Sequence, residues 1–144
     1  MLIGEFKHTI DDKNRVSLPS KFRKEVGKKV IVTHGLDNCL FLYTLKEWET
    51  IAKQLGSLGM GQADTRGFNR YILASAAEVL VDSVGRILIP ENLRQAIGIK
   101  NKIVFAGLYN RIEIWEEEAW DKYKAQVVKN ADQMAEKLGE IGAI

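Results

Sequence analysis

The sequence repeats itself once, and this repeat constrains the fold more than any other feature of the 144-residue chain. The segment Asp11–Pro19 (DDKNRVSLP) aligns with Asp82–Pro90 (DSVGRILIP) at an offset of 71, and Trp48 aligns with Trp120 at an offset of 72. The matches fall on glycines, prolines, charged loop residues and apolar positions, so chance is a poor explanation. Two copies are too few for a solenoid, which needs three or more stacked units. The repeat therefore predicts two halves that share one core in a pseudo-twofold arrangement.

Alternation of apolar and polar residues predicts the first two strands of the first half. One tight loop, one short helix and two further strands complete this half. The polar residues 11–14 make the tight loop. Pro19 suits the first position of the helix, and Gly27 suits its end. The second half repeats this order over residues 79–115. The expected strands of the first half cover residues 6–10, 15–18, 29–33 and 40–43.

An amphipathic helix is expected after each half. Residues 44–47 have the form of a capping box, and apolar residues follow them at helical spacing. A further helix is expected near Asp64 and a last one near Glu116, whose apolar stripe suits packing on its own domain or on a neighbouring subunit. We divide the chain into a first half, a helical connection, a second half, and a C-terminal helix with its tail: residues 5–48, 49–75, 76–120 and 116–144.

The composition favours a globular cytoplasmic protein. Hydrophobic residues make up 46% of the chain and charged residues 28%, and no apolar run approaches the roughly 20 residues that span a bilayer. The N-terminus lacks the basic start and apolar stretch of a signal peptide. Cys39 is the only cysteine, which excludes an intramolecular disulfide and a cysteine-based metal cluster and favours a reducing compartment.

Charge is distributed unevenly along the chain, although the net charge is only +2. Residues 11–29 hold seven basic and three acidic side chains, a net of +4, whereas residues 113–124 hold two basic and five acidic, a net of −3. A local basic surface is what a nucleic-acid-binding protein needs. A solvated face of mixed charge is an equally good explanation of these counts taken alone.

The repeated Asp-x-x-x-Arg loop, followed by an alternating strand and a proline, resembles the MraZ family of bacterial regulators. The resemblance covers nearly the whole chain, from Glu5 to about Tyr123, and includes GEFKHTID at residues 4–11, GLDNCLFLY at residues 35–43 and RIEIW at residues 111–115. It implies a β-rich α+β fold. The two tandem halves would be AbrB-like swapped hairpins, resembling a double-psi β-barrel, with flanking helices.

The same resemblance implies a sequence-specific DNA-binding transcriptional regulator without cofactor, membrane or small-molecule substrate. Members of the family bind short direct repeats of double-stranded DNA upstream of the division and cell-wall gene cluster, typically control their own operon, and assemble into rings. A nucleoid-associated, cytoplasmic homo-oligomer is therefore expected. Occupancy of several repeats by one ring would multiply weak individual contacts through effective concentration.

Arg15 and Arg86 are the first candidates for contact with DNA, by the resemblance and by their place in the repeat. A guanidinium can neutralise a phosphate or bind guanine in a fork. The alternative is an exposed arginine that merely pairs with the aspartate four residues before it.

Four further residues are expected to shape the two loops. A carboxylate is a poor partner for an anionic polymer, so we interpret Asp11 and Asp82 as loop formers that accept hydrogen bonds from backbone N–H groups and hold the arginines. Gly85 adopts positive φ freely, and Asn14, which replaces glycine in the first copy, tolerates it.

The remaining basic residues of this region are candidates for phosphate contact that is independent of base sequence. A plain solvated position is an equally good reading of each taken singly, and Arg94, which repeats Arg23, is also explained as a helix-surface residue. The candidates are Lys7, Lys13, Lys21, Arg23 and Lys24.

The sequence offers few candidate catalytic residues, so no enzyme is expected. Neither His8 nor His34 lies at a nucleophile or metal spacing, and Gly59-Met60-Gly61 lacks the lysine and length of a phosphate-binding loop. The rival hypothesis is an oligomeric protein-interaction scaffold that uses the acidic region 113–121. An antitoxin-like role, known in the wider AbrB group, usually involves a disordered toxin-binding tail that this sequence does not show.

Overall fold

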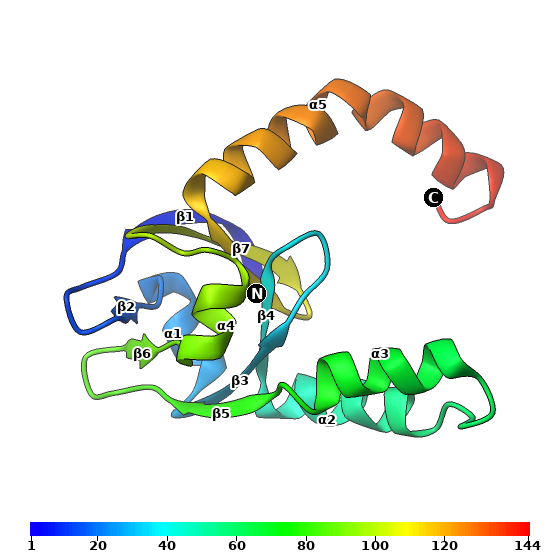
Figure 1. The fold of residues 1–144 in the computed structure, drawn as a ribbon. Helices are drawn as coiled ribbons and strands as arrows, with labels where there is room; N and C mark the ends of the chain where they lie inside the picture. Colours follow the sequence, from blue (N-terminus) through cyan, green and yellow to red (C-terminus); the bar gives the residue numbers. More distant parts are fainter.

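The computed structural model describes residues 1–144 and has an α+β fold, with helical arms that project from a curved sheet (Figure 1). In chain order its elements are β1 (Leu2–Thr9), β2 (Arg15–Ser17), α1 (Ser20–Val26), β3 (Lys29–His34), β4 (Leu40–Thr44), α2 (Leu45–Gly56), α3 (Ala63–Leu73), β5 (Ala77–Leu80), β6 (Arg86–Leu88), α4 (Glu91–Ala96), β7 (Lys102–Tyr109), β8 (Ile112–Glu116) and α5 (Glu117–Glu140).

The tandem repeat is confirmed in the topology of the main sheet. Its six strands lie in the order β1-β7-β8-β4-β3-β5, and all neighbours are antiparallel. The first strand of each half pairs with the third strand of the other half, so that Phe6 lies opposite Phe105 and Val30 opposite Val79. Reading the order from either edge gives the same succession of equivalent strands. The two halves therefore share one sheet.

A separate two-stranded ribbon lies beside this sheet. Strands β2 and β6, one from each half, pair antiparallel with Val16 opposite Ile87. Both of these side chains are buried, at 1% exposed each. The edge strands β1 and β5 of the main sheet do not pair with each other. The strands therefore form two antiparallel sheets and not the closed barrel that the resemblance implied.

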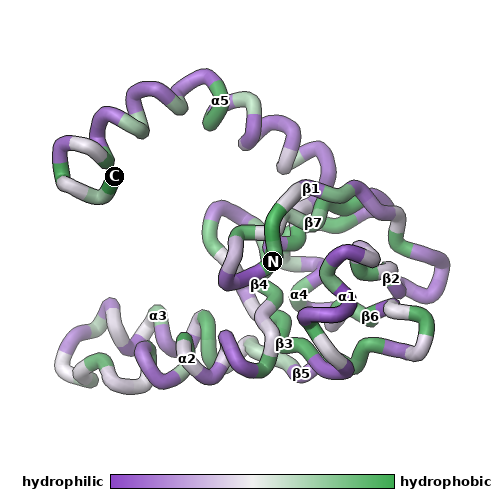
Figure 2. Tube along the Cα trace, turned by 180° about the vertical axis from the view of Figure 1, so that it is seen from behind, coloured by the Kyte–Doolittle hydropathy of each residue, from purple (hydrophilic) through white to green (hydrophobic).

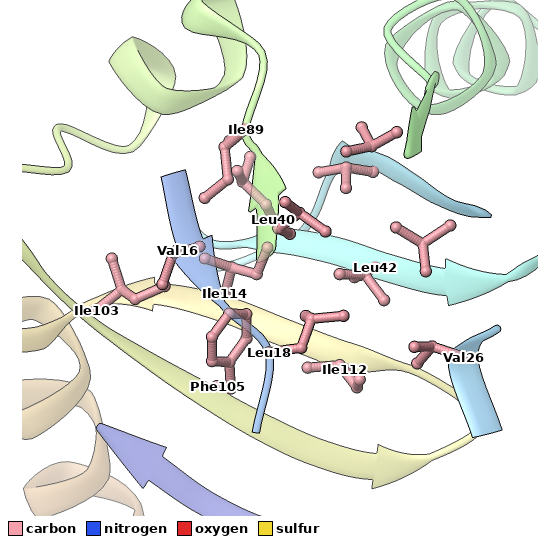
Figure 3. Packing of buried hydrophobic residues seen from close by; sticks show 14 of the residues in the cluster. Val16, Leu18, Val26, Leu40, Leu42, Ile89, Ile103, Phe105, Ile112 and Ile114 are labelled. Atoms are coloured by element: carbon pink, nitrogen blue, oxygen red, sulfur yellow. The ribbon is translucent and has the colours of Figure 1, made fainter. Parts of the chain in front are cut away.

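Both halves fill one hydrophobic core of 19 buried residues. Figure 3 shows side chains from strands of both halves, among them Val16, Leu42 and Phe105, pointing into the same interior. Phe22 of α1 and Leu93 of α4, which are equivalent in the repeat, are fully buried there. Since neither half encloses this core alone, the pseudo-twofold arrangement is a condition of stability.

The structure contains more helix than strand, whereas a β-rich fold was expected. Helices hold 42% of the residues and strands 29%, chiefly because α5 alone has 24 residues. Strand β1 also begins at Leu2, four residues earlier than predicted, because it pairs with β7 along its whole length. Pairing with a strand about 100 positions away is invisible to local alternation, so this boundary was wrong.

The α2–α3 hairpin and α5 extend from the same side of the sheet (Figures 1 and 2). Their roots pack on a second cluster, in which Trp115 contacts Trp120 and Tyr123 at ring-centroid distances of 5.3 and 4.9 Å. Beyond Tyr123, hydrophilic residues predominate along α5 (Figure 2), and Val128 and Met134 are exposed. The apolar stripe predicted for this helix therefore packs on its own domain only at the root. No helix has the length and apolar character needed to cross a membrane.

Cys39 is a free cysteine buried in the second cluster. It is 1% exposed, its Sγ lies 3.1 Å from the Leu36 carbonyl oxygen, and burial raises the pKa of the thiol. The thiolate, the reactive form, is therefore suppressed at pH 8. We expect native protein to give almost no reaction with a thiol-specific disulfide reagent at that pH, and urea-unfolded protein to release one equivalent per chain. Rapid reaction of the native protein would show that this core opens readily.

Candidate nucleic-acid interface

The loop before β2 is organised by a single carboxylate. Asp11 Oδ1 accepts hydrogen bonds from the backbone N–H groups of Lys13 (2.9 Å) and Arg15 (2.8 Å). Asp11 Oδ2 accepts one from Arg15 Nε at 2.8 Å. The backbone closes the turn with bonds from Asp11 N–H to the Arg15 carbonyl and from Asn14 N–H to the Asp11 carbonyl. Asn14 has φ +62°, the left-handed conformation expected for it.

The loop before β6 repeats this arrangement. Asp82 Oδ1 accepts from the N–H groups of Val84 (3.0 Å) and Arg86 (2.8 Å), and Asp82 Oδ2 accepts from Arg86 Nε at 2.8 Å. Gly85 takes the left-handed position, with φ +83°. Sequence spacing alone predicted both loops because every one of these bonds joins residues at most four positions apart.

The hydrogen bonds also fix the charge of both aspartates. The Arg15 N–H lowers the pKa of the Asp11 carboxyl, with smaller contributions from the Arg15 side chain and the Lys13 N–H. The equivalent donors, led by the Arg86 N–H, lower the pKa of Asp82. Both carboxylates are thus ionised throughout the neutral range. They hold each guanidinium by Nε only, and neither Nη atom of Arg15 or Arg86 has a partner within the chain.

Both arginines lie on one face of the β2–β6 ribbon. Arg15 is opposite Leu88, and Arg86 is opposite Ser17. Residues directly opposite in an antiparallel pair project to the same face, and diagonal neighbours are roughly 7–8 Å apart. Since Val16 and Ile87 face the core, the face with the arginines is the outer one. Figures 1 and 2 show the two loops side by side at the end of the molecule away from α5. One subunit therefore presents two guanidinium groups on a single surface.

The other candidate residues are placed differently. Lys13 lies in the first loop, and Lys21 and Lys24 are exposed on α1. Arg23, also on α1, contacts the other half of the chain: its side chain packs against Gly85 of the second loop. Lys7 lies on β1 and forms an exposed ion pair with Asp121 of α5, at 3.8 Å. Arg23 and Lys13 thus join the two arginines at the ribbon.

Sequence reasoning left Arg94 as either a counterpart of Arg23 or a helix-surface residue. Arg94 of α4 lines one groove together with Lys13 and Asn14, and Arg23 lines a different groove beside residues 82–85. The repeat already matched Arg94 with Arg23, so it held the signal. The repeat could not show that α1 and α4 each lie beside the loop of the opposite half.

The acidic region that supports a protein scaffold is largely occupied by internal contacts. Glu113 is 8% exposed and accepts hydrogen bonds from Arg111 and from Trp115 Nε1. Glu116 caps α5 by accepting the Ala119 N–H, and Asp121 pairs with Lys7. Of the five acidic residues in this region, only Glu117 and Glu118 have no side-chain partner within the chain.

The histidines take part in aromatic packing. The ring of His8 meets the edge of Phe105 at 5.6 Å between centroids, and His34 stacks on Tyr71 at 4.7 Å. No three histidine, cysteine, aspartate or glutamate side chains converge to hold a metal ion. The arginine-bearing ribbon is thus the surface whose chemistry suggests a ligand.

Comparison with known proteins gives one consistent result. The family model described as "MraZ protein, putative antitoxin-like" matches twice, at residues 1–71 and 72–139. The chain is 48% identical to the transcriptional regulator MraZ of Caldicellulosiruptor saccharolyticus over 142 residues, which is 99% of either chain. It is 45% identical to that of Thermoanaerobacter sp. strain X514 and 44% identical to that of Acetivibrio thermocellus, covering 98% or more of each chain.

Proposed function

The chain belongs to the MraZ family, a family of DNA-binding transcriptional regulators and not of enzymes, and we propose that it binds repeated boxes in its own promoter as a homo-oligomer. By the resemblance, that promoter precedes a division and cell-wall gene cluster. This role places the protein in the cytoplasm, at the nucleoid. The exchange of first strands between the halves supports the finer assignment of two AbrB-like swapped hairpins.

The observation that carries the proposal is the pair of guanidinium groups on one face of the ribbon. Each is held by Nε, and its two Nη groups have no partner within the chain. A guanidinium presented in this way can bind a phosphate oxygen pair or the O6 and N7 atoms of guanine. The rigid Asp-centred loops reduce the entropy that these arginines lose on binding, since their side chains are already ordered.

Assembly follows from the weakness of a single subunit. Two arginines and a few lysines make a small site, and several subunits engaging spaced boxes together raise the effective concentration of each contact. The exposed apolar residues of α5 and of the α2–α3 hairpin support self-association, because they find no cover within the chain. A ring is the closed form of such an assembly.

The proposal is tested by titrating the protein against fluorescently labelled DNA from its own upstream region. The control is a scrambled duplex of the same length and base composition, and both titrations are run over a salt series. We expect a clear preference for the upstream region. Each neutralised phosphate contributes roughly −0.9 to the slope of log K against log salt, so we expect a steep negative slope. Equal weak binding to both duplexes would contradict promoter recognition.

The scaffold hypothesis keeps one specific observation in its favour, namely the long exposed arm α5. It predicts an assembled protein without selective DNA binding. Light scattering on the same samples establishes that the protein is assembled, and the titration then separates the two functions, because assembled protein without a preference for the promoter supports the scaffold.

A further inference from the structure

We infer that the two DNA-binding loops of a subunit are unequal, because Arg23 of the first half is a phosphate-binding residue of the loop 82–86 in the second half. The inference rests on the proposed DNA-binding function; it assigns Arg23, already a candidate for phosphate contact, to the loop of the opposite half and adds an asymmetry between the two loops. Its counterpart Arg94 makes no equivalent contribution to the loop 11–15. The repeat alone would assign the two arginines identical roles.

Arg23 is held against the second loop by specific contacts. Its Nε donates to the Leu18 carbonyl at 3.0 Å, and the Leu18 N–H donates to the Gly85 carbonyl at 2.9 Å. Leu18 thus links the arginine to the loop. Neither Nη atom of Arg23 has a partner in the chain, and the side chain is exposed. Arg23 therefore resembles Arg15 and Arg86 in being fixed through Nε with its outer nitrogens open to solvent.

Gly85 makes this placement possible. A Cβ atom at residue 85 would lie 2.5 Å from Arg23 Nε and 2.7 Å from its Cζ. Both distances are too short, so the side chain of Arg23 would have to move away. Gly85 thus has two functions, since it also takes the positive φ of the turn. A larger residue that tolerates positive φ would preserve the turn but displace the guanidinium.

The first loop contains that larger residue. Asn14 occupies the position of Gly85, with φ +62° and a side chain. Arg94 is half-buried and reaches the Ile89 carbonyl through Nη1, at 3.3 Å, instead of through Nε. The bond from the Ile89 N–H to the Asn14 carbonyl, equivalent to Leu18–Gly85, is absent. One of the two outer nitrogens of Arg94 is therefore occupied by a hydrogen bond within the protein.

The test compares Arg23→Ala with the matched control Arg94→Ala in salt titrations. Phosphate contacts are independent of base sequence, so the upstream and the scrambled duplex both serve. We expect Arg23→Ala to weaken binding to both and to make the salt slope shallower by roughly 0.9 for each bound subunit. Arg94→Ala is expected to leave the slope unchanged. If the two variants have the same salt slope, whether or not it differs from the wild-type slope, the inference is overturned.

Two further variants separate phosphate binding from mere support of the loop. Arg23→Lys keeps the charge but loses the Nε bond to Leu18, so it is expected to restore most of the salt slope if Arg23 binds phosphate. If Arg23 only supports the loop, Arg23→Lys behaves like Arg23→Ala, and the inference fails. Gly85→Asn is expected to reproduce the shallower slope of Arg23→Ala, and combining the two substitutions should add little.

The outcomes for the two proposals are distinguishable. If the wild-type protein binds both duplexes without preference, promoter recognition fails while the contrast between Arg23→Ala and Arg94→Ala still decides the inference. If the wild-type protein prefers its promoter but Arg23→Ala matches wild type, the inference alone fails. If the wild-type protein binds no DNA, both are wrong. Thermal melting and light scattering of each variant establish that fold and assembly are retained.

Discussion

Replacing Arg15 and Arg86 together by alanine is expected to abolish selective binding to the promoter while leaving the fold intact. Each good arginine–guanine pair contributes about 1–3 kcal/mol of discrimination. Losing two removes ~2–6 kcal/mol of discrimination, a fall in the preference for the promoter of about 30-fold or more, since every 1.4 kcal/mol is tenfold. Both side chains are one-third exposed and bond only to their own loop aspartate. Their removal therefore leaves the core untouched, and a fluorescence anisotropy titration measures the loss.

The control must remove the same charge from elsewhere. Lys53 lies on α2 and Lys137 on α5, outside the ribbon, so the double variant Lys53→Ala/Lys137→Ala matches the change in net charge. We expect it to keep its preference for the promoter and most of its affinity. If the arginine variant still distinguishes the promoter from the scrambled duplex, the ribbon is not the reading surface. If both double variants lose affinity equally, only overall charge matters.

Phe22→Ala is expected to destabilise the protein by about 3–5 kcal/mol, the range for removing a buried aromatic side chain. Phe22 is fully buried and packs edge-on against Phe6, with ring centroids 5.2 Å apart. It anchors the seven-residue helix α1, which has no side-chain cap and only Val26 as a second buried residue. Truncation therefore leaves a cavity and releases the helix that holds Arg23.

Urea unfolding followed by far-UV circular dichroism measures this loss, at one protomer concentration because assembly also stabilises the fold. Phe68→Ala is the matched control, since Phe68 lies on α3 and is 39% exposed. We expect a clearly smaller loss for it. A loss for Phe22→Ala no larger than for Phe68→Ala would show that α1 is not fastened to the core through this ring.

Because of the placement of Arg23, we expect the loops and the core to be coupled in this protein. Helix α1 follows β2 directly, with Phe22 in the core and Arg23 on the opposite loop. A change that loosens Phe22 is thus expected to reach the DNA surface as well as the stability. Measurements of binding on core variants need a check that the protein is folded at the working temperature.

The sequence by itself determined the features that depend on local spacing. The offset between Asp11 and Asp82 revealed the two halves, and the four-residue separation of each aspartate from its arginine predicted the loops. Positive φ at Asn14 was expected because a turn of this length demands it. These interactions lie within a few residues, where the covalent chain already restricts the geometry.

Only the tertiary structure decided which half each element serves. Strand β1 pairs with β7, and Arg23 packs on Gly85. Both contacts join one half to the other. Neither has a periodicity or spacing that marks it in the sequence. Contacts between distant segments depend on how the complete core packs, and the local pattern of residues carries no record of that packing.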